Sequence, residues 1–191
     1  MRFVDRVLVM HRALDDAGIG HAFGGAIALA YAVHEPRATI DIDLNISADP
    51  MAPRVVLKAM PPGVTWGAAD VRAIRADGQV RLRWDNVPVD LFFPQHAFHA
   101  VVADRSVMVP LEDAMIPVIS ATDLMVFKAL FNRTKDWADI EAILEAGTAH
   151  ADEALDWLEQ IVGVDAPSYE RLAALARNGP ATDRRGPSRW S

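Results

Sequence analysis

The amino-acid sequence predicts an α+β fold, in which a mixed sheet flanked by helices precedes a bundle of C-terminal helices. Two patterns lead to this prediction. Between residues 21 and 119, short stretches of apolar residues, some of them alternating with polar ones, are separated by Pro, Gly and Asn, which is typical of strands joined by turns. From Ser120 onward, apolar residues recur at the three- and four-residue spacing of amphipathic helices.

The first part of the chain mixes both kinds of element. Residues 38–46 alternate strictly between apolar and polar, as expected for a half-buried strand. Asp77-Gly78 between two short apolar stretches predicts a two-residue hairpin turn, and Asn86 predicts another turn. We expect helices at 3–16, 26–33, 52–60 and 95–103, and strands at 21–23, 38–46, 71–76, 79–84, 87–93, 107–109 and 118–119.

The second part of the chain is predicted to be helical. Ser120 to Asp123 resembles a capping box with Asp in place of Glu, and it opens a helix that continues through Phe131. Further helices are expected at 135–145, 152–162 and 169–177. The sequence therefore divides into a catalytic core at 1–119, a helical region at 120–179 and an Arg-rich tail at 180–191, which we expect to be mobile.

Composition excludes several classes of protein. The 191 residues contain no cysteine, which rules out disulfides, thiol catalysis and cysteine zinc sites. The N-terminus carries acids that a signal peptide would lack, and no apolar run approaches the roughly 20 residues that span a bilayer. We therefore expect a cytoplasmic protein with no membrane partner.

Charge is distributed unevenly along the chain. The net charge is −7, which argues against a general nucleic-acid binder. Residues 136–170 contain ten acids and no Lys or Arg, whereas residues 51–85 contain six Lys or Arg and three acids. A polyanion would be drawn to the second segment, although these charges could equally do no more than solvate exposed faces.

Three carboxylates form the most informative pattern. Asp41 and Asp43 lie two residues apart in a predicted strand, so their side chains share one face of the sheet. Adjacent carboxylates repel one another unless a cation lies between them, and Mg²⁺ or Mn²⁺ accepts such oxygen ligands. Asp90 in the apolar stretch 87–93 could be a third ligand. The competing interpretation is that all three are ordinary solvent-facing residues.

Two further groups of residues fit a phosphate ligand. Gly24-Gly25 precedes a predicted helix, whose free N–H groups could bind phosphate, although a plain turn is the more common explanation of two adjacent glycines. Lys128 and Arg133 could neutralise a triphosphate, and Asp136 could orient one of these cations. A surface cluster of salt bridges is the simpler explanation for Arg133, Lys135 and Asp139.

Together these residues resemble the DNA polymerase β-like nucleotidyltransferases, and within them the AbiEii and MenT-type toxins of bacterial toxin–antitoxin systems. The resemblance covers roughly residues 20–145. A departure from many of these enzymes is Gly25, where they carry Ser, so no hydroxyl is offered to phosphate there. The matching residues are Gly24-Gly25, Arg37-x-Thr39-x-Asp41-x-Asp43, Asp90, Lys128 and Arg133-x-Lys135-Asp136-x-x-Asp139.

The resemblance implies a role for each of these residues. Asp41 and Asp43 would hold metal ions, and Asp90 would help to activate the acceptor hydroxyl. The nucleotide would contact the remaining residues, which are Gly24 and Gly25 along the triphosphate, Lys128 and Arg133 on its charge, Arg37 and Thr39 shaping the site, and Asp136 on the nucleotide side.

The resemblance also implies a substrate and partners. Such toxins are expected to transfer a nucleotide, often a pyrimidine, from an NTP to the 3′ end of tRNA, and a cognate antitoxin protein is expected to restrain them. The charge distribution suggests that an RNA acceptor would lie against residues 54–83. Alternatives are an acceptor hydroxyl on a protein or an aminoglycoside, and a catalytically silent nucleotide-binding or antitoxin-like module.

Overall fold

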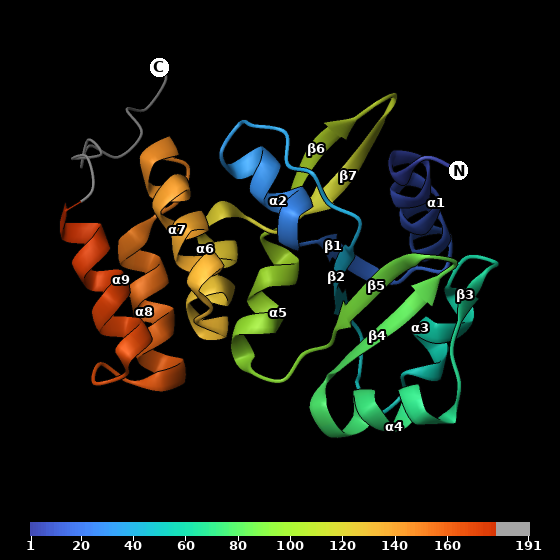
Figure 1. The fold of residues 1–191 in the computed structure, drawn as a ribbon. Helices are drawn as coiled ribbons and strands as arrows, with labels where there is room; N and C mark the ends of the chain where they lie inside the picture. Colours follow the sequence, from blue (N-terminus) through green and yellow to red (C-terminus); the bar gives the residue numbers. More distant parts are fainter. Residues whose placement is uncertain (179–191) are drawn as a thin grey trace, which may run out of the picture.

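A seven-stranded mixed sheet forms the centre of the molecule (Figure 1). The computed structural model describes residues 1–178, without the side chains of Ala103 and Asn178, so the predicted Arg-rich tail lies outside the described residues. The strand order is β3-β4-β5-β2-β1-β7-β6. The strands are β1 (Gly20–Phe23), β2 (Ile42–Ser47), β3 (Val64–Thr65), β4 (Gln79–Trp84), β5 (Val87–Phe92), β6 (Val107–Leu111) and β7 (Ala114–Val118).

Helices flank this sheet and then continue as a packed C-terminal group, α6 to α9, on one side of it (Figure 1). The α+β prediction is therefore confirmed. Among residues 1–178, no helix is both long enough and apolar enough to cross a membrane. The helices are α1 (Phe3–Asp16), α2 (Gly25–Ala32), α3 (Arg54–Ala59), α4 (Ala68–Asp77), α5 (Ala97–Asp104), α6 (Ala121–Phe131), α7 (Thr134–Ala146), α8 (Ala151–Val162) and α9 (Pro167–Asn178).

The register of β2, β4 and β5 decides which side chains meet. Strands β2 and β5 are parallel, and Asp43 lies opposite Asp90. Strands β4 and β5 form an antiparallel hairpin, in which Arg81 lies opposite Asp90. The two-residue turn of this hairpin is Asp85-Asn86, and Asp85 adopts a positive φ of 54°, which Asp tolerates better than most residues.

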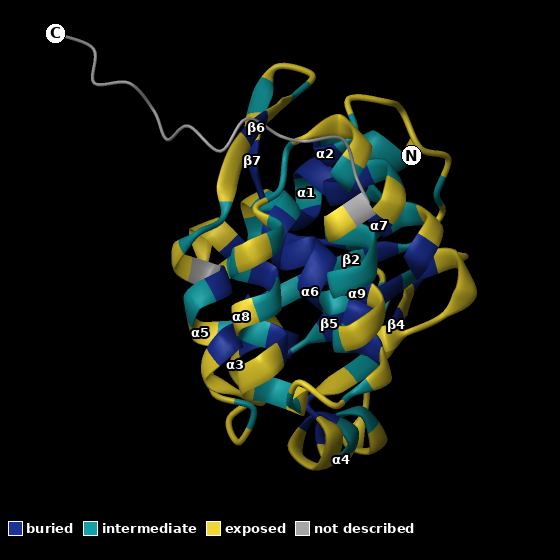
Figure 2. Cartoon of the chain, turned by 90° about the vertical axis from the view of Figure 1, so that its left-hand side faces the viewer, coloured by how far each residue is buried: buried dark blue, intermediate teal, exposed yellow. Residues whose placement is uncertain are grey.

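Burial separates the two faces of β2. Ile42, Leu44 and Ile46 are almost fully buried in the hydrophobic core, whereas Asp43 and Asn45 on the other face are only partly buried. Helix α6 packs deep in the molecule, as Figure 2 shows. The alternation therefore leaves the polar face of β2 open to a space between the sheet and the C-terminal helices.

Residues 71–76 were expected to form a strand, and that prediction is wrong. They belong to α4, in which Val71 and Ile74 are buried at helical spacing. The Asp70 carboxylate accepts a hydrogen bond from the N–H of Gly67 at 2.7 Å and caps the helix start. Gly78 ends the helix in the left-handed conformation, with φ of 63°, so Asp77-Gly78 is a helix end and no hairpin turn.

Two predicted strand limits also differ from the structure. Strand β2 begins at Ile42, so residues 38–41 form an irregular segment before it. The strand expected at 118–119 spans Ala114–Val118, where it pairs with β6 across a turn at Glu112, whose φ is 54°. A proline in each of β6 and β7 had obscured the alternation of this hairpin.

Candidate active site

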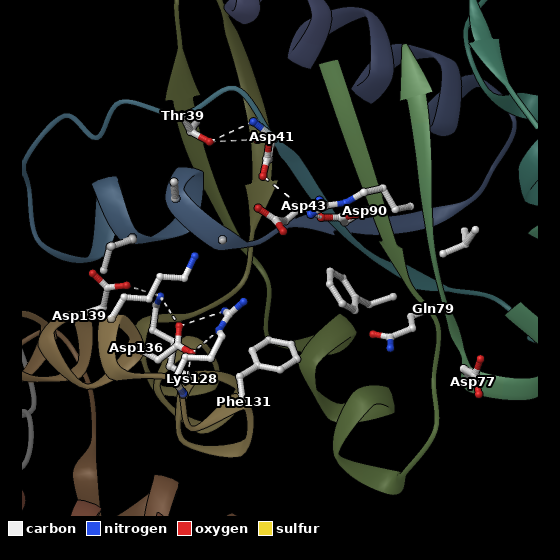
Figure 3. A pocket seen from close by; sticks show the side chains of 18 of the residues that line it. Thr39, Asp41, Asp43, Asp77, Gln79, Asp90, Lys128, Phe131, Asp136 and Asp139 are labelled. Atoms are coloured by element: carbon white, nitrogen blue, oxygen red, sulfur yellow. Dashed lines mark hydrogen bonds and ion pairs between the residues drawn. The ribbon is translucent and has the colours of Figure 1, made fainter. Parts of the chain in front are cut away.

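Three carboxylates lie together at one wall of a cavity (Figure 3). Asp43 on β2 and Asp90 on β5 are register partners on neighbouring strands, so their side chains project from the same face of the sheet. Asp41 lies two residues before Asp43, in the segment that leads into β2. The side chain of Asp90 is 13% exposed and that of Asp41 is 37% exposed.

The electrostatics of Asp43 show how crowded this wall is. Burial, the largest cause, acts together with the neighbouring carboxylates of Asp90 and Asp41 to raise the pKa of the Asp43 carboxyl to about 6. Arg81 and Lys128 oppose the shift without cancelling it. Asp41, Asp43 and Asp90 face a single cation on this wall, Arg81, so the wall carries the net negative charge that a site for an added cation requires.

Gly25 lies against this wall at the start of α2. Its φ of +50° belongs to the left-handed region, and a Cβ at this position would overlap the Asp43 carboxylate. The N–H of Gly24 donates a hydrogen bond to the main-chain oxygen of Asp43 at 2.9 Å, which ties the helix start to β2. The positive end of α2 therefore lies beside the carboxylates, where a phosphate group could bind it.

The opposite wall of the cavity comes from α6 and α7. Lys128 is buried on α6 and donates to Asp139 Oδ2 at 2.6 Å, while Asp136 Oδ1 lies 3.7 Å from the same ammonium group. Arg133 binds the fully buried Asp136 with two side-chain hydrogen bonds, from Nε at 2.6 Å and from Nη2 at 3.0 Å. These pairs hold two cations at the cavity with their positions fixed.

Burial by itself would raise the pKa of Asp136, but the hydrogen bonds and charge of Arg133 hold it below its ordinary value. Asp136 is therefore ionised at neutral pH and acts as the anchor of Arg133. Asp139, for which a surface salt bridge was the simpler expectation, instead lines the cavity with Lys128.

The cavity measures about 620 Å³ and also has an aromatic side. Phe131 at the end of α6 is 45% exposed, and its ring centroid lies 6.1 Å from that of Phe92 on β5. The guanidinium of Arg133 lies 5.0 Å from the centroid of the Phe131 ring, in a cation–π arrangement. An exposed ring at a cavity wall can accept a flat ligand.

Most of the residues predicted for the site line this cavity, namely Gly25, Thr39, Asp41, Asp43, Asp90, Lys128, Arg133 and Asp136. Thr39 Oγ1 accepts a hydrogen bond from the Asp41 N–H at 3.1 Å and so shapes the loop before β2. Gly24 adjoins the cavity through its bond to Asp43. Arg37 is exposed and is not among the residues that line the cavity.

Sequence reasoning missed Arg81 and Phe131 as members of this site. Arg81 Nε and Nη2 donate to the two carboxylate oxygens of Asp90 at 2.7 and 2.6 Å. A signal for this pair existed, because a two-residue turn at Asp85-Asn86 necessarily sets residue 81 opposite residue 90. Phe131 gave no such signal, since an aromatic residue at a helix end is usually part of a core.

The donor set fits a divalent cation such as Mg²⁺ or Mn²⁺. The carboxylates of Asp41, Asp43 and Asp90 offer oxygen ligands on one wall, and the open shape leaves room for phosphate oxygens as further ligands. Among residues 1–178, no three His, Cys, Asp or Glu side chains already converge closely enough to hold a metal ion. Both oxygens of Asp90 are engaged by Arg81 instead.

Comparison with solved structures identifies the fold. The solution structure of the antibiotic-resistance factor ANT(2″)-Ia matches with a TM-score of 0.57 at 14% identity, over 92% of this chain and 95% of the other. A nucleotidyltransferase-like protein from Paracoccidioides brasiliensis matches with a TM-score of 0.50 at 15% identity, over 92% of each chain. This chain has a polymerase β-like nucleotidyltransferase fold.

Sequence comparison adds nothing to this result, since no family model and no curated protein matches the chain. Within the nucleotidyltransferase fold, the cavity lies where the start of α2 at Gly25 meets the polar face of β2 and β5, and it faces the helical region. The fold and the chemistry of the cavity are thus separate observations, and both bear on function.

Proposed function

We propose that this protein is a metal-dependent nucleotidyltransferase, which transfers a nucleoside monophosphate from an NTP to an acceptor hydroxyl. The observation that carries the proposal is the meeting of Asp41, Asp43 and Asp90 in one cavity with the start of α2 and with two cationic side chains. Carboxylates alone would suit many functions. Carboxylates facing an anion-binding helix start and fixed cations suit a metal-bound triphosphate.

The proposed reaction breaks one bond and forms one. The acceptor oxygen bonds to the α-phosphorus of the NTP while the bond from this phosphorus to the bridging oxygen breaks, and pyrophosphate leaves. Asp90 would accept the proton of the acceptor hydroxyl. Asp41, Asp43 and Asp90 would hold Mg²⁺ or Mn²⁺, which would supply charge neutralisation for the phosphates and for the leaving oxygen.

The other side chains of the cavity would bind the nucleotide. The N–H groups at Gly24 and Gly25 would contact phosphate oxygens, and Lys128 and Arg133 would offset the negative charge of the triphosphate. Phe131 would stack on the base. Residues 1–119 would then act as the catalytic core, and the helical region from residue 120 would complete the nucleotide site.

For the acceptor, we propose the 3′ end of tRNA, with the protein acting as a toxin restrained by a cognate antitoxin. Two features support this choice. Strand β4, from the basic part of the chain, brings the cation Arg81 to the cavity wall, and α4 beside it contributes Ala73 and Asp77. The acidic segment 136–170 includes α8 and most of α7, so an RNA strand would approach from the α4 side.

A small-molecule hydroxyl, as on an aminoglycoside, is the second candidate acceptor. It is supported by the match to ANT(2″)-Ia, an antibiotic-resistance factor whose chain is covered almost completely. The many carboxylates of the cavity would also attract a polycationic ligand. A hydroxyl on a protein partner is a third acceptor that the same chemistry would serve.

Incubation of the purified protein with α-³²P-labelled NTPs tests the proposal. Separate reactions contain total RNA, purified tRNA, soluble protein or an aminoglycoside, each with Mg²⁺ or Mn²⁺. We expect label at tRNA 3′ ends, none with Asp43→Asn, and unchanged labelling with Asp156→Asn, which alters an exposed residue of α8. Label only in the aminoglycoside or protein reaction would transfer the proposal to that acceptor.

The toxin hypothesis needs a second test in cells. Expression of the wild-type chain should arrest growth, and co-expression of the neighbouring gene product should relieve the arrest. Asp41→Ala should abolish it. If no acceptor takes up label, and Asp41→Ala inhibits growth as strongly as the wild type, the protein is a silent nucleotide-binding or interaction module.

A further inference from the structure

Arg81, Asp90 and Asp43 form a row across three neighbouring strands. Arg81 on β4 lies opposite Asp90 on β5, and Asp90 lies opposite Asp43 on β2. All three side chains line the same cavity. The backbone pairing of the sheet therefore fixes a cation beside the carboxylates, before any ligand is considered.

The guanidinium of Arg81 engages both oxygens of the Asp90 carboxylate. Nε donates to Oδ1 at 2.7 Å and Nη2 donates to Oδ2 at 2.6 Å, so neither oxygen is left without a partner. The same Nη2 lies 3.8 Å from Asp41 Oδ2. One guanidinium thus serves two of the three carboxylates that a divalent cation would use.

The position of Arg81 makes this contact exchangeable. The Arg81 side chain is 59% exposed whereas that of Asp90 is 13% exposed, so the guanidinium is the partner with room to move and Asp90 stays fixed on β5. Arg does not lose its proton near neutral pH, so the oxygen lone pairs that Asp90 gives to Arg81 become free for a cation only if the guanidinium moves away. A triphosphate in the cavity would offer Arg81 alternative oxygen acceptors of the kind that guanidinium groups bind well.

We propose that Arg81 is a positioning residue that withholds Asp90 from divalent cations until a nucleotide triphosphate draws its guanidinium away. The inference rests on the proposed function. Without nucleotide, a divalent cation meets mainly Asp41 and Asp43. With nucleotide, Arg81 turns to the phosphates and Asp90 joins the ligands. Cation affinity and nucleotide binding are thereby coupled through a single side chain.

Mn²⁺ binding, measured by electron paramagnetic resonance on the nucleotide-free protein, tests this role without requiring turnover. Arg81→Gln should bind Mn²⁺ about tenfold more tightly than the wild type, as expected when a charge-assisted pair no longer competes. Arg81→Lys, which keeps the charge but loses the paired contact, should fall between them. The matched control is Arg83→Gln, on the same face of β4, which should resemble the wild type.

A double variant separates release of Asp90 from a general effect of removing positive charge. Asp90→Asn should abolish the gain, so that Arg81→Gln with Asp90→Asn binds Mn²⁺ no better than Asp90→Asn alone. Saturation with a non-hydrolysable NTP should raise the affinity of the wild type and narrow its difference from Arg81→Gln. Circular dichroism of each variant verifies the fold.

The outcomes separate this inference from the function on which it rests. If the wild type binds Mn²⁺ and Arg81→Gln binds it equally or more weakly, the role of Arg81 is wrong and the proposed function stands. A gain that persists with Asp90→Asn also overturns the role of Arg81. If no folded variant binds Mn²⁺ with or without nucleotide, the proposed metal-dependent function fails as well.

Discussion

Gly25 and Asp43 approach one another so closely that no side chain fits between them. A Cβ built on Gly25 would overlap the Asp43 Oδ2 atom and stand 2.5 Å from Cγ. The φ of +50° at Gly25 adds a conformational reason for glycine. The start of α2 thus touches the carboxylate wall directly, and the two halves of the proposed site depend on one contact.

Replacing Gly25 by alanine should therefore displace Asp43 and remove Mn²⁺ binding and nucleotidyl transfer together. The matched control is Gly18→Ala, because Gly18 has a φ of +66° and no atom within 4 Å of the added Cβ. The control should lose only about 1–2 kcal/mol of stability from left-handed strain and keep Mn²⁺ affinity. Denaturant unfolding and Mn²⁺ titration compare the two, and unchanged Mn²⁺ affinity in Gly25→Ala would contradict the prediction.

The raised pKa of Asp43 predicts the pH dependence of cation binding. Burial and the neighbouring carboxylates raise this pKa to about 6, and a divalent cation binds the ionised form. Mn²⁺ affinity should therefore rise as pH increases through about 6 and level off above 7. Isothermal titration calorimetry between pH 5 and 8 measures this, and a flat profile would show that Asp43 does not ligate the ion.

The same shift predicts that the metal-free protein becomes less stable as pH rises. The folded state holds the Asp43 proton up to about pH 6, whereas the unfolded chain releases it near 3.8, so stability falls across that interval. The loss should be about 3 kcal/mol. Asp43→Asn should abolish this pH-dependent loss of stability, whereas Asp156→Asn should show the same loss as the wild type. Urea unfolding with a chelator present measures the free energy of unfolding of each variant. Saturating Mg²⁺ should restore stability at pH 8.

The alternation in residues 42–46 was enough to predict the strand that carries Asp43 and the shared face of the carboxylates. Local pattern works there because one face of β2 is in the core and the other is polar. The same reasoning failed at residues 71–76, where both a strand and a helix suit the apolar spacing, and the capping contact of Asp70 decides for the helix.

What local pattern could not supply is the contact between distant segments. The pairing of Lys128 with Asp139 joins two helices across a turn at Asn132, which has a left-handed φ of 53°. The exposure of Arg37 depends on the path of an irregular loop, and such a loop has no periodic sequence pattern that predicts its conformation. The position of Phe131 at the cavity depends on how α6 packs beside β5, which is a tertiary property.

Replacing Lys128 should change both NTP affinity and the free energy of unfolding, for two different physical reasons. Lys128→Met removes the cation that we assign to the triphosphate, and it leaves the Asp139 carboxylate, whose side chain is 20% exposed, without its partner. Asp136 keeps its hydrogen bonds from Arg133, so the fold should survive. We expect NTP affinity to fall at least about tenfold and stability to fall by about 2 kcal/mol.

Adding Asp139→Asn to Lys128→Met tests the cause of each loss. The double variant no longer contains an unpaired carboxylate, so it should recover most of the lost stability while NTP affinity stays low. Thermal unfolding and a fluorescent-nucleotide titration provide the two measurements. Recovery of NTP affinity in the double variant would mean that repulsion by Asp139, rather than absence of the Lys128 charge, had weakened binding.

Phe131 should contribute to binding through the base and not through the phosphates. Its ring is 45% exposed, so Phe131→Ala creates little cavity and should change stability only slightly. Loss of base stacking, at about 1 kcal/mol or more, should weaken NTP binding roughly fivefold or more. Affinity for inorganic tripolyphosphate should not change, since it has no base to stack.

Val107→Ala, at a 48% exposed position on β6, serves as the matched control and should bind both ligands like the wild type. Equal weakening of NTP and tripolyphosphate would show that Phe131 shapes the phosphate site instead, because a stacking contact cannot act on a ligand without a ring.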